Sequence, residues 1–211
     1  MSKITGIKKG KARRARINVF LDGKPAIKLL PETVLKENLK RGEEISETRL
    51  EELAIKDLRQ RCFNTAARFI GYRPRSEAEI RQRLAHRGFD ADTIEKTVAK
   101  LEETGLADDG AFARFWIENR EMFRPRSRRL AKLELKRKGL KSDVIDEAVS
   151  ILDDRENARR AAAARTQRLA GLDYQEFRRR LGQYLARRGF SYEIVKETLE
   201  RAWKEQGGKT A

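Results

Sequence analysis

The chain has 211 residues, of which 49 are lysine or arginine and 33 are aspartate or glutamate, so its formal net charge is +16. The single cysteine, Cys62, excludes an internal disulfide and a cysteine-based zinc site, and the single histidine, His86, excludes most histidine catalysis. Such positive charge is typical of proteins that work beside a polyanion, and nucleic acid is the first candidate. We therefore expect no enzyme of the common kinds, no cofactor and no metal.

Segments that would direct the chain to a membrane are missing from the sequence. It has no apolar run of 18 residues, no hydrophobic segment of a signal peptide after Lys3, and no amphipathic anchor at an end. The positive charge could also serve an anionic membrane surface, but these absences favour a soluble, cytoplasmic protein with no membrane partner.

The first thirty residues carry a strand pattern that differs from the rest of the chain. Residues 16–21 alternate in character, the Asp-Gly pair at 22–23 is a favoured two-residue hairpin turn, and apolar residues return at 26–30. This pattern predicts a β-hairpin, to which residues 4–8 could add a third strand through the basic turn at 8–11. A small meander of this kind needs a helix against its apolar face.

Two helices are expected next. The first is short and begins at Pro31, where it can cover the meander. The second begins at Ser46 and ends before Gly71, and its apolar positions are Leu50, Leu53, Ile55, Leu58 and Cys62, with the pattern running on towards Ile70.

One pattern then occurs three times, about fifty residues apart, at 84–89, 135–140 and 185–190. Each copy has a leucine four residues before a glycine, basic residues between them, and an apolar residue after the glycine. This order predicts a helix end, because glycine takes the left-handed conformation there without steric cost and cations face the negative end of the helix dipole. Apolar residues six and ten positions after each glycine predict a further helix with a repeated buried stripe: Ile94, Ile145 and Val195, then Val98, Val149 and Leu199.

Helix starts in the first two copies follow from capping residues. In the first copy, a capping box at 76–79 begins a helix and Asp90 begins another that runs to about Glu103. In the second copy, Asp109 is expected to cap a helix that Arg124-Pro125 breaks, Ser127 begins the next helix, and Ser142 or Lys141 the last.

The third copy begins near Asp154, has a second helix that starts early, at a capping box at 173–176, and ends with a helix over 192–203. The predicted fold is therefore mainly α, with three tandem three-helix repeats in an elongated, curved array and a small N-terminal β-hairpin or meander. The expected domains are 1–45 (hairpin and short helix), 46–105, 106–153 and 154–206 (helical repeats 1 to 3), and 207–211 (disordered tail).

Positive charge is densest in the second copy, where nine cations over 124–141 stand against one acid, Glu134. The spacing of Arg128, Lys132 and Lys136 predicts one helix face without neutralising neighbours, and like charges so placed destabilise a helix. A contact with phosphate or acidic protein is favoured, and a plain solvated face is the alternative. The candidate binding residues are Arg124, Arg126, Arg128, Arg129, Lys132, Lys136 and Arg137, together with Arg165, Arg168, Arg179 and Arg180 of the third copy.

Other residues receive plainer interpretations. Arginine binds phosphate and carboxylate alike, so composition does not choose between DNA and an acidic protein groove. Asp108 and Asp109 could be metal ligands, but helix caps in a turn explain them better. Helical spacing among aliphatic residues favours a core role over base stacking for Phe112, Phe115, Trp116 and Trp203.

Residues 104–117, Thr-Gly-Leu-Ala-Asp-Asp-Gly-Ala-Phe-Ala-Arg-Phe-Trp-Ile, followed by Leu130 and by Leu-Lys-Arg-Lys-Gly-Leu at 135–140, resemble the RecX family of bacterial recombination regulators. The stretch Arg-Ser-Glu-Ala-Glu-Ile at 75–80 resembles that family too. The similarity covers residues 60–205 and all three copies, and the N-terminal hairpin resembles an extension carried by some longer members.

The resemblance implies tandem three-helix repeats, no catalytic residues, and a protein that binds the RecA recombinase filament on DNA and suppresses its ATPase, strand-exchange and coprotease activities. It thereby implies a role in homologous recombination, DNA repair and the SOS response. We expect a monomer that binds single-stranded DNA, and also duplex DNA, weakly. The alternative is a stand-alone, sequence-nonspecific nucleic-acid-binding protein, whose affinity would come from counterion release. A nuclease is a poor third hypothesis, because only the acidic pair at 108–109 suggests a metal.

Overall fold

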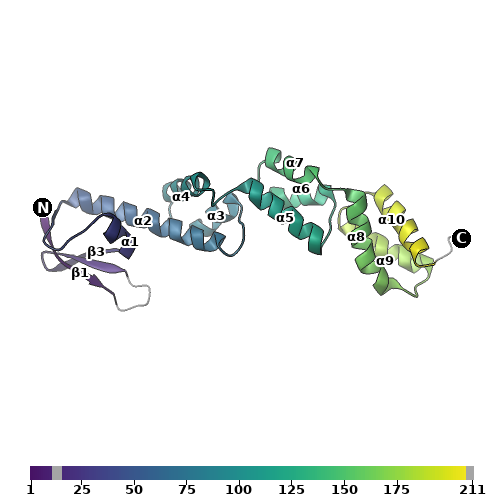
Figure 1. Ribbon diagram of the computed structural model, residues 1–211, viewed down its shortest axis with the longest axis horizontal. Helices are drawn as coiled ribbons and strands as arrows, with labels where there is room; N and C mark the ends of the chain where they lie inside the picture. The colour runs from purple at the N-terminus through teal and green to yellow at the C-terminus, as the bar shows by residue number, and fades with distance from the viewer. Residues whose placement is uncertain (11–15, 208–211) are drawn as a thin grey trace. The chain divides into compact units, whose positions relative to one another are not determined.

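The computed structural model describes residues 1–10 and 16–207 (Figure 1). In this part of the chain, three three-helix segments follow a small antiparallel sheet, which confirms the predicted fold class. The residues form two compact units: unit 1 contains Met1–Arg73 and Ile80–Ala107, and unit 2 contains Pro74–Glu79 and Asp108–Ala211. The predicted turn at 8–11 and tail at 207–211 lie partly outside the described residues. The domain boundaries and the elongated, curved form stay predictions.

Four strands make up the sheet: β1 (Ser2–Lys9), β2 (Ile17–Leu21), β3 (Lys24–Leu29) and β4 (Glu44–Ile45), in the order β3-β2-β1-β4. The turn between β2 and β3 has positive φ at both central positions, 48° and 81°, as a type I′ hairpin requires. The predicted hairpin and third strand are therefore confirmed. Strand β4 was not predicted, because two residues are too few to produce an alternating pattern.

Two helices cover the sheet, as its apolar face requires. They are α1 (Pro31–Lys36) and the first half of α2 (Glu47–Ile70), whose Leu53 is buried in the core of the sheet. The second half of α2 supplies Cys62 and Ala66 to the core of the first three-helix segment. One long helix thus takes part in two cores.

Asp57 is a buried carboxylate that the apolar pattern of α2 did not predict. Its Oδ1 accepts hydrogen bonds from the backbone N of Leu30 at 2.5 Å and from Oγ1 of Thr33 at 3.2 Å, and its Oδ2 pairs with Arg16 at 2.6 Å. These partners make burial of the charge tolerable, and they fix the start of α1, where Leu30 has no capping side chain.

The sequence pattern also placed Ile55 on the buried side of α2. That prediction is wrong, since the residue is 49% exposed.

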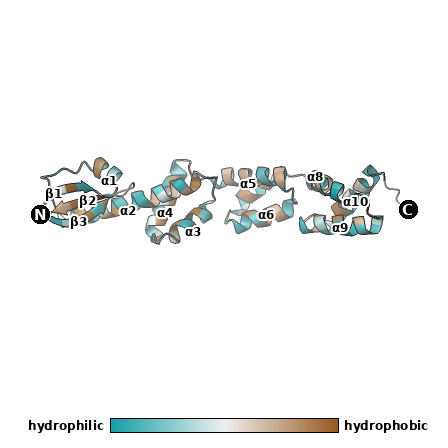
Figure 2. Ribbon diagram, turned by 90° about the horizontal axis from the view of Figure 1, so that it is seen from below, coloured by the Kyte–Doolittle hydropathy of each residue, from teal (hydrophilic) through white to brown (hydrophobic). Residues whose placement is uncertain are grey.

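The helical segments have these elements: α3 (Glu77–Ala85) and α4 (Ala91–Glu103) with the end of α2; α5 (Asp109–Phe123), α6 (Arg128–Arg137) and α7 (Ser142–Ser150); α8 (Asp154–Thr166), the 3₁₀ turn η1 (Gln167–Leu169), α9 (Tyr174–Arg187) and α10 (Tyr192–Glu205). Figure 2 shows that hydrophobic and hydrophilic residues both occur on the helices labelled there. The repeated leucines, Leu84, Leu135 and Leu185, are fully buried, so the predicted periodicity is confirmed. Helix α9 also begins early, as expected.

One predicted cap is wrong by a single residue. Asp108, with an extended backbone, caps α5, and its carboxylate accepts from the backbone N of Ala111 at 2.9 Å. Asp109 is instead the first residue of α5, and its Oδ1 accepts from the backbone N of Glu77 at 2.9 Å. The capping role therefore belongs to the first aspartate of the pair, and the second makes a long-range contact.

Unit 2 contains two joints at which the beginning of one middle helix meets the end of the next. At the first, Oγ of Ser76 donates to the backbone O of Lys138 at 2.7 Å, beside the bond from Glu77 to Asp109. The joint is also held by an ion pair of 2.7 Å between Lys138 and Glu79.

The second joint repeats this arrangement one copy later. The backbone N of Ser127 donates to the backbone O of Arg188 at 3.0 Å, and the backbone N of Arg128 donates to Oδ1 of Asp154 at 2.6 Å. In both joints a carbonyl just before the repeated glycine and an aspartate at the start of the next segment satisfy polar groups of a helix beginning, which is where unpaired N–H groups occur.

The repeated glycines of these joints have two separate reasons to be glycine. Gly139 and Gly189 have φ of 82° and 86°, in the left-handed region. A Cβ atom at Gly139 would also overlap the Cβ of Ala78, and one at Gly189 would lie 2.5 Å from Oγ of Ser127. Gly88 shares the conformation, with φ of 81°, but has open space around it among the described residues.

Candidate nucleic-acid and partner interface

Glu134 of α6 is the centre of a polar network between α5 and α6. Its Oε2 accepts from Nε1 of Trp116 at 3.0 Å and from Nε of Arg120 at 2.9 Å, and its Oε1 pairs with the guanidinium of Arg126. The Arg120 guanidinium also lies 4.5 Å from the centre of the Trp116 ring. Because this carboxylate is bound on the inner side, it does not neutralise the outer face of α6.

Arg126, a predicted binding residue, is mostly buried beside Glu134. Burial lowers the pKa of the Arg126 guanidinium, and the neighbouring charges of Arg120, Arg188 and Arg124 lower this pKa further. Arg188 in turn donates to the backbone O of Pro125 at 2.9 Å. Arg120 and Arg126 thus share a single carboxylate, and the further charges of Arg188 and Arg124 lie close enough to act on Arg126. Arg124 is the exposed member of these four arginines.

The prediction that the α6 cations have no neutralising neighbours is wrong for one of them, Lys132, whose Nζ pairs with Asp146 at 2.5 Å. Arg128 keeps its charge, but its guanidinium donates to the backbone O of Leu152 at 2.5 Å and is therefore held against the protein. Asp146 lies in α7, 14 residues after Lys132, and Leu152 lies just after α7, 24 residues after Arg128. The helix spacing that placed both cations on a shared face could not show partners from another helix.

The remaining cations of α6 form a free surface, which we call the α6 stripe: Arg129, Lys136 and Arg137. All three are exposed, and within the described residues their side chains have no hydrogen-bond or ion-pair partner. Their spacing of i, i+7 and i+8 places them on the side of the helix that faces away from buried Leu135. Leu133, on the same side, is 41% exposed, so the stripe also offers apolar surface.

Arg179 and Arg180 of the third copy are exposed, but both are bound to a carboxylate of the protein. Nε of Arg179 and Nε of Arg180 donate to Glu176 at 2.7 and 2.6 Å, and these two hydrogen bonds lower the pKa of Glu176 to about 2. Arg165 is half-buried, with its guanidinium 5.6 Å from the centre of the Tyr184 ring. Arg165 therefore has a packing role that its sequence neighbours do not indicate.

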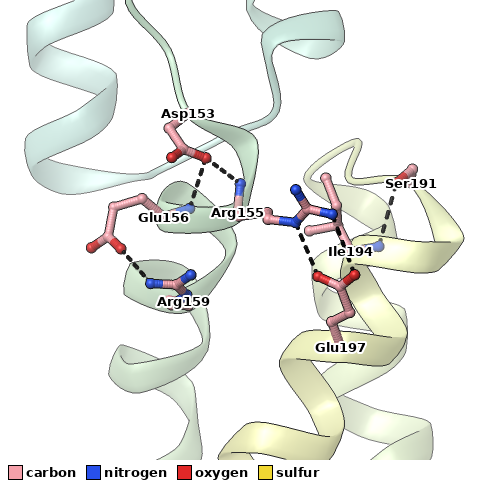
Figure 3. Close-up of polar contacts among 7 residues, drawn as sticks. All are labelled: Asp153, Arg155, Glu156, Arg159, Ser191, Ile194 and Glu197. Carbon is pink, nitrogen blue, oxygen red and sulfur yellow. Dashed lines mark hydrogen bonds and ion pairs between the residues drawn. The ribbon is translucent and has the colours of Figure 1, made fainter.

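Two arginines of α8 are also neutralised by glutamates, as Figure 3 shows. Arg155 pairs with Glu197 of α10 at 3.1 Å, and Arg159 pairs with Glu156 at 3.2 Å. Arg168, in η1, is exposed and has no such partner in the described part of the chain. The third copy therefore presents fewer free cations than its arginine count suggests.

The predicted binding residues fall into three groups in the structure. Those that are exposed without a partner among the described residues are Arg124, Arg129, Lys136, Arg137 and Arg168. Those that are exposed but bound to protein groups are Arg128, Lys132, Arg179 and Arg180, and the buried or half-buried ones are Arg126 and Arg165. Only the first group combines an exposed charge with a side chain that no other group of the described residues holds.

Another concentration of arginines was missed by the sequence analysis. It lines a groove of about 500 Å³ in unit 1, between α2 and the end of α3. The pattern that could have revealed it is the spacing of Arg61 and Arg68 on α2, at i and i+7, with Tyr72 at i+11 just beyond the end of the helix. This pattern was overlooked because the charge was less dense there than around α6.

Among the described residues, no group of three or more histidine, cysteine, aspartate or glutamate side chains is placed to hold a metal ion. Cys62 is buried, and this burial raises the pKa of its thiol, so the thiolate that would react is disfavoured. In the same part of the chain, no helix has the length and apolar character needed to cross a membrane.

Family models match the chain in four consecutive segments. They are described as RecX N-terminal domain (residues 2–46) and as the first, second and third three-helix domains of RecX (62–101, 108–149 and 153–199).

Curated relatives and solved structures point the same way. The regulatory protein RecX of Clostridium beijerinckii is 30% identical over 207 residues, which cover 95% of this chain and 96% of that protein. The Streptomyces coelicolor relative of the same name is 36% identical over 65% of this chain and 74% of its own length. A crystal structure of regulatory protein RecX superimposes with a TM-score of 0.72 at 22% identity, covering 95% of this chain and all of that one. That of RecX from Lactobacillus salivarius gives 0.60 at 21% identity, over 70% and 97% of the two chains.

Proposed function

The chain belongs to the RecX family, and from this premise we propose that it is a non-enzymatic regulator that binds the RecA nucleoprotein filament and inhibits its ATPase, strand-exchange and coprotease activities. The match to relatives named regulatory proteins supports this proposal. It extends to a monomer that acts in the cytoplasm, in homologous recombination, DNA repair and the SOS response.

The observation that carries the proposed contact is the α6 stripe. Its three cations are exposed on one side of a short helix, and their repulsion is not relieved by any carboxylate in the described part of the chain. Contact with DNA phosphate or with an acidic filament surface would relieve it, and guanidinium groups suit both. Arg126 and Arg165, which are mostly or half buried, would act as positioning residues, and Arg124 and Arg168 would extend the exposed contact.

The proposed inhibition needs no chemical step by this chain. A protein that binds one arrangement of the filament better than another shifts the filament towards the arrangement it prefers. Binding that favours an inactive arrangement of RecA protomers, or their loss from DNA, would lower all three filament activities together.

We expect this protein, at substoichiometric to equimolar amounts, to slow the DNA-dependent hydrolysis of ATP by RecA. The measurement is a titration of the protein into cognate RecA, ATP and circular single-stranded DNA, with the steady-state hydrolysis rate as readout. A parallel titration without DNA controls for an effect on free RecA. Hydrolysis that stays unchanged at saturating protein would show the proposed function to be wrong.

A stand-alone nucleic-acid-binding protein is the second candidate, and the net charge of +16 favours it. The two candidates differ in what RecA does to the affinity for DNA. A filament regulator binds single-stranded DNA much more tightly when RecA and ATP are present, whereas an independent binder competes with RecA for the strand.

Bare-DNA binding is expected to be weak and to fall steeply with salt. Each phosphate contact on a single strand contributes roughly −0.7 to the slope of log affinity against log salt, so the α6 stripe alone contributes about −2. Fluorescence anisotropy of labelled oligonucleotides of several sequences, measured between low and physiological salt, gives both the slope and the sequence preference. A shallow slope, or a tight sequence-specific complex at high salt, would contradict the electrostatic account.

A further inference from the structure

Four arginines line the groove of about 500 Å³ in unit 1, and no acidic residue lines it. Arg61 and Arg68 come from α2, seven residues and therefore about 10 Å apart along the helix axis. Arg83 lies in the last turn of α3, and Arg87 follows that helix. All four side chains are exposed, and Arg61, Arg68 and Arg87 have no carboxylate partner within residues 1–10 and 16–207. The groove therefore carries a concentrated positive charge, and an anionic ligand would bind there favourably.

Three aromatic side chains line the same groove, and one of them is unusually exposed. Tyr72 is 80% exposed and lies two residues after the end of α2. Phe69 and Phe89 are half-buried, and the guanidinium of Arg83 lies 5.5 Å from the centre of the Phe69 ring. By contrast, Phe112 of the second segment is completely buried. The aromatic ring of Tyr72 thus lies in water beside cations, where it adds little to the core.

We propose that this groove binds a single strand of nucleic acid, with its arginines on backbone phosphates and Tyr72 stacked on a base. Arginine is suited to phosphate because its planar fork makes two parallel hydrogen bonds. Aromatic side chains beside a basic groove are the arrangement by which proteins bind single strands without reading sequence, since every base has a face to stack.

The exposed ring of Tyr72 favours a single strand of nucleic acid over other polyanions as the ligand. An acidic protein segment would satisfy the arginines but would offer no planar group to Tyr72. A duplex would offer phosphates, but its bases are already stacked on one another. The site lies in unit 1, apart from the α6 stripe. It deepens the proposed association with single-stranded DNA, and its test does not require RecA.

Tyr72→Ala is expected to weaken binding of a fluorescein-labelled oligothymidylate about 5- to 150-fold, as the loss of one stacked base implies. The measurement is fluorescence anisotropy with the full chain, without RecA, at several salt concentrations. Tyr72→Phe keeps the ring and should bind within about twofold of the parent. Because stacking involves no phosphate, the salt slope of Tyr72→Ala should equal that of the parent. Tyr192→Ala is the matched control, because Tyr192 is 75% exposed in unit 2, and it should leave the affinity unchanged.

The arginines are tested by replacing Arg61, Arg68 and Arg87 together with glutamine. The salt slope should become shallower by about 2, at roughly 0.7 for each lost phosphate contact. These side chains are exposed, so circular dichroism should show parent-like helicity.

Two results would overturn this inference. One is parent-like affinity of Tyr72→Ala. The other is displacement of the oligonucleotide from the parent by polyglutamate, combined with dependence on the arginines and not on Tyr72, which would assign the groove to an acidic protein segment. Either result leaves the inhibition of RecA untouched, so failure of this site and failure of the proposed function can be told apart.

Discussion

Replacing Arg129, Lys136 and Arg137 together with glutamate is expected to raise the amount of protein needed for half-maximal inhibition of RecA at least about tenfold. These are the α6 cations whose side chains have no hydrogen-bond or ion-pair partner in the described residues. Reversal would place three negative charges against an anionic partner, at a cost of several kcal/mol, and each 1.4 kcal/mol is a factor of ten in affinity. The measurement is the RecA ATPase titration described above.

The matching control reverses three exposed lysines of the sheet, Lys9, Lys24 and Lys28, which changes the net charge of the chain by the same amount. It should inhibit RecA as the parent does. If both variants lose inhibition equally, net charge matters and the α6 stripe does not; if the stripe variant inhibits fully, the stripe is only a solvated face.

Folding must be separated from binding in this experiment, because acidic residues near the end of α6 oppose the helix dipole by up to about 1 kcal/mol each. A second variant with glutamine at the three positions avoids that effect and should still lose inhibition. Arg128 and Lys132 are best left unchanged, since they bind the backbone O of Leu152 and the carboxylate of Asp146. Their reversal would place glutamate against these oxygens and damage the fold.

Gly139→Val is expected to lower the free energy of unfolding by about 2 to 6 kcal/mol. A β-branched residue in the left-handed region costs about 1 to 3 kcal/mol, and forced overlap in a packed contact adds about 1 to 3 kcal/mol. Both conditions hold at Gly139, whose φ is 82° and whose added Cβ would overlap the Cβ of Ala78. Urea unfolding followed by circular dichroism measures the change.

Gly88→Val is the matched control for conformation alone, because Gly88 has a φ of 81° and open space around it among the described residues. It should cost clearly less than Gly139→Val. The overlap itself is tested by combining Gly139→Ala with Ala78→Gly, which removes the opposing Cβ. The double variant should be more stable than the sum of the single changes predicts, by about 0.5 to 3 kcal/mol. Strict additivity would mean that the joint yields to a side chain at this position.

Most of the fold was predictable because its determinants are local. A leucine, a helix-ending glycine and an apolar stripe lie within about fifteen residues in each copy, and Leu84, Leu135 and Leu185 are all fully buried. The errors concern groups whose partners are distant in sequence. Asp57 is buried because Leu30, Thr33 and Arg16 reach it from other elements, which no helical periodicity can show.

The candidate site was predictable only as a concentration of charge. Sequence density pointed to α6, but it could not separate free Arg129 from Lys132, whose neutralising Asp146 belongs to α7. It also passed over the unit 1 groove, because Arg61 and Arg87 are far apart along the chain and meet only after α2 and α3 pack. Tyr72 gave no sequence indication of its exposure, since an aromatic residue after a helix is usually packed.

The two sides of each joint in unit 2 are different. One side is the beginning of a helix, and the other is the end of a helix that a glycine follows. Helix α6 supplies one side of each joint. At its start, the backbone N of Ser127 donates to the backbone O of Arg188, and at its end, just before Gly139, the backbone O of Lys138 accepts from Oγ of Ser76. A duplicated stretch of the gene encoding one copy would therefore bring matching ends with it. Chains of this design can change their number of copies during evolution without a new interface having to arise, and their outer faces can diverge independently afterwards.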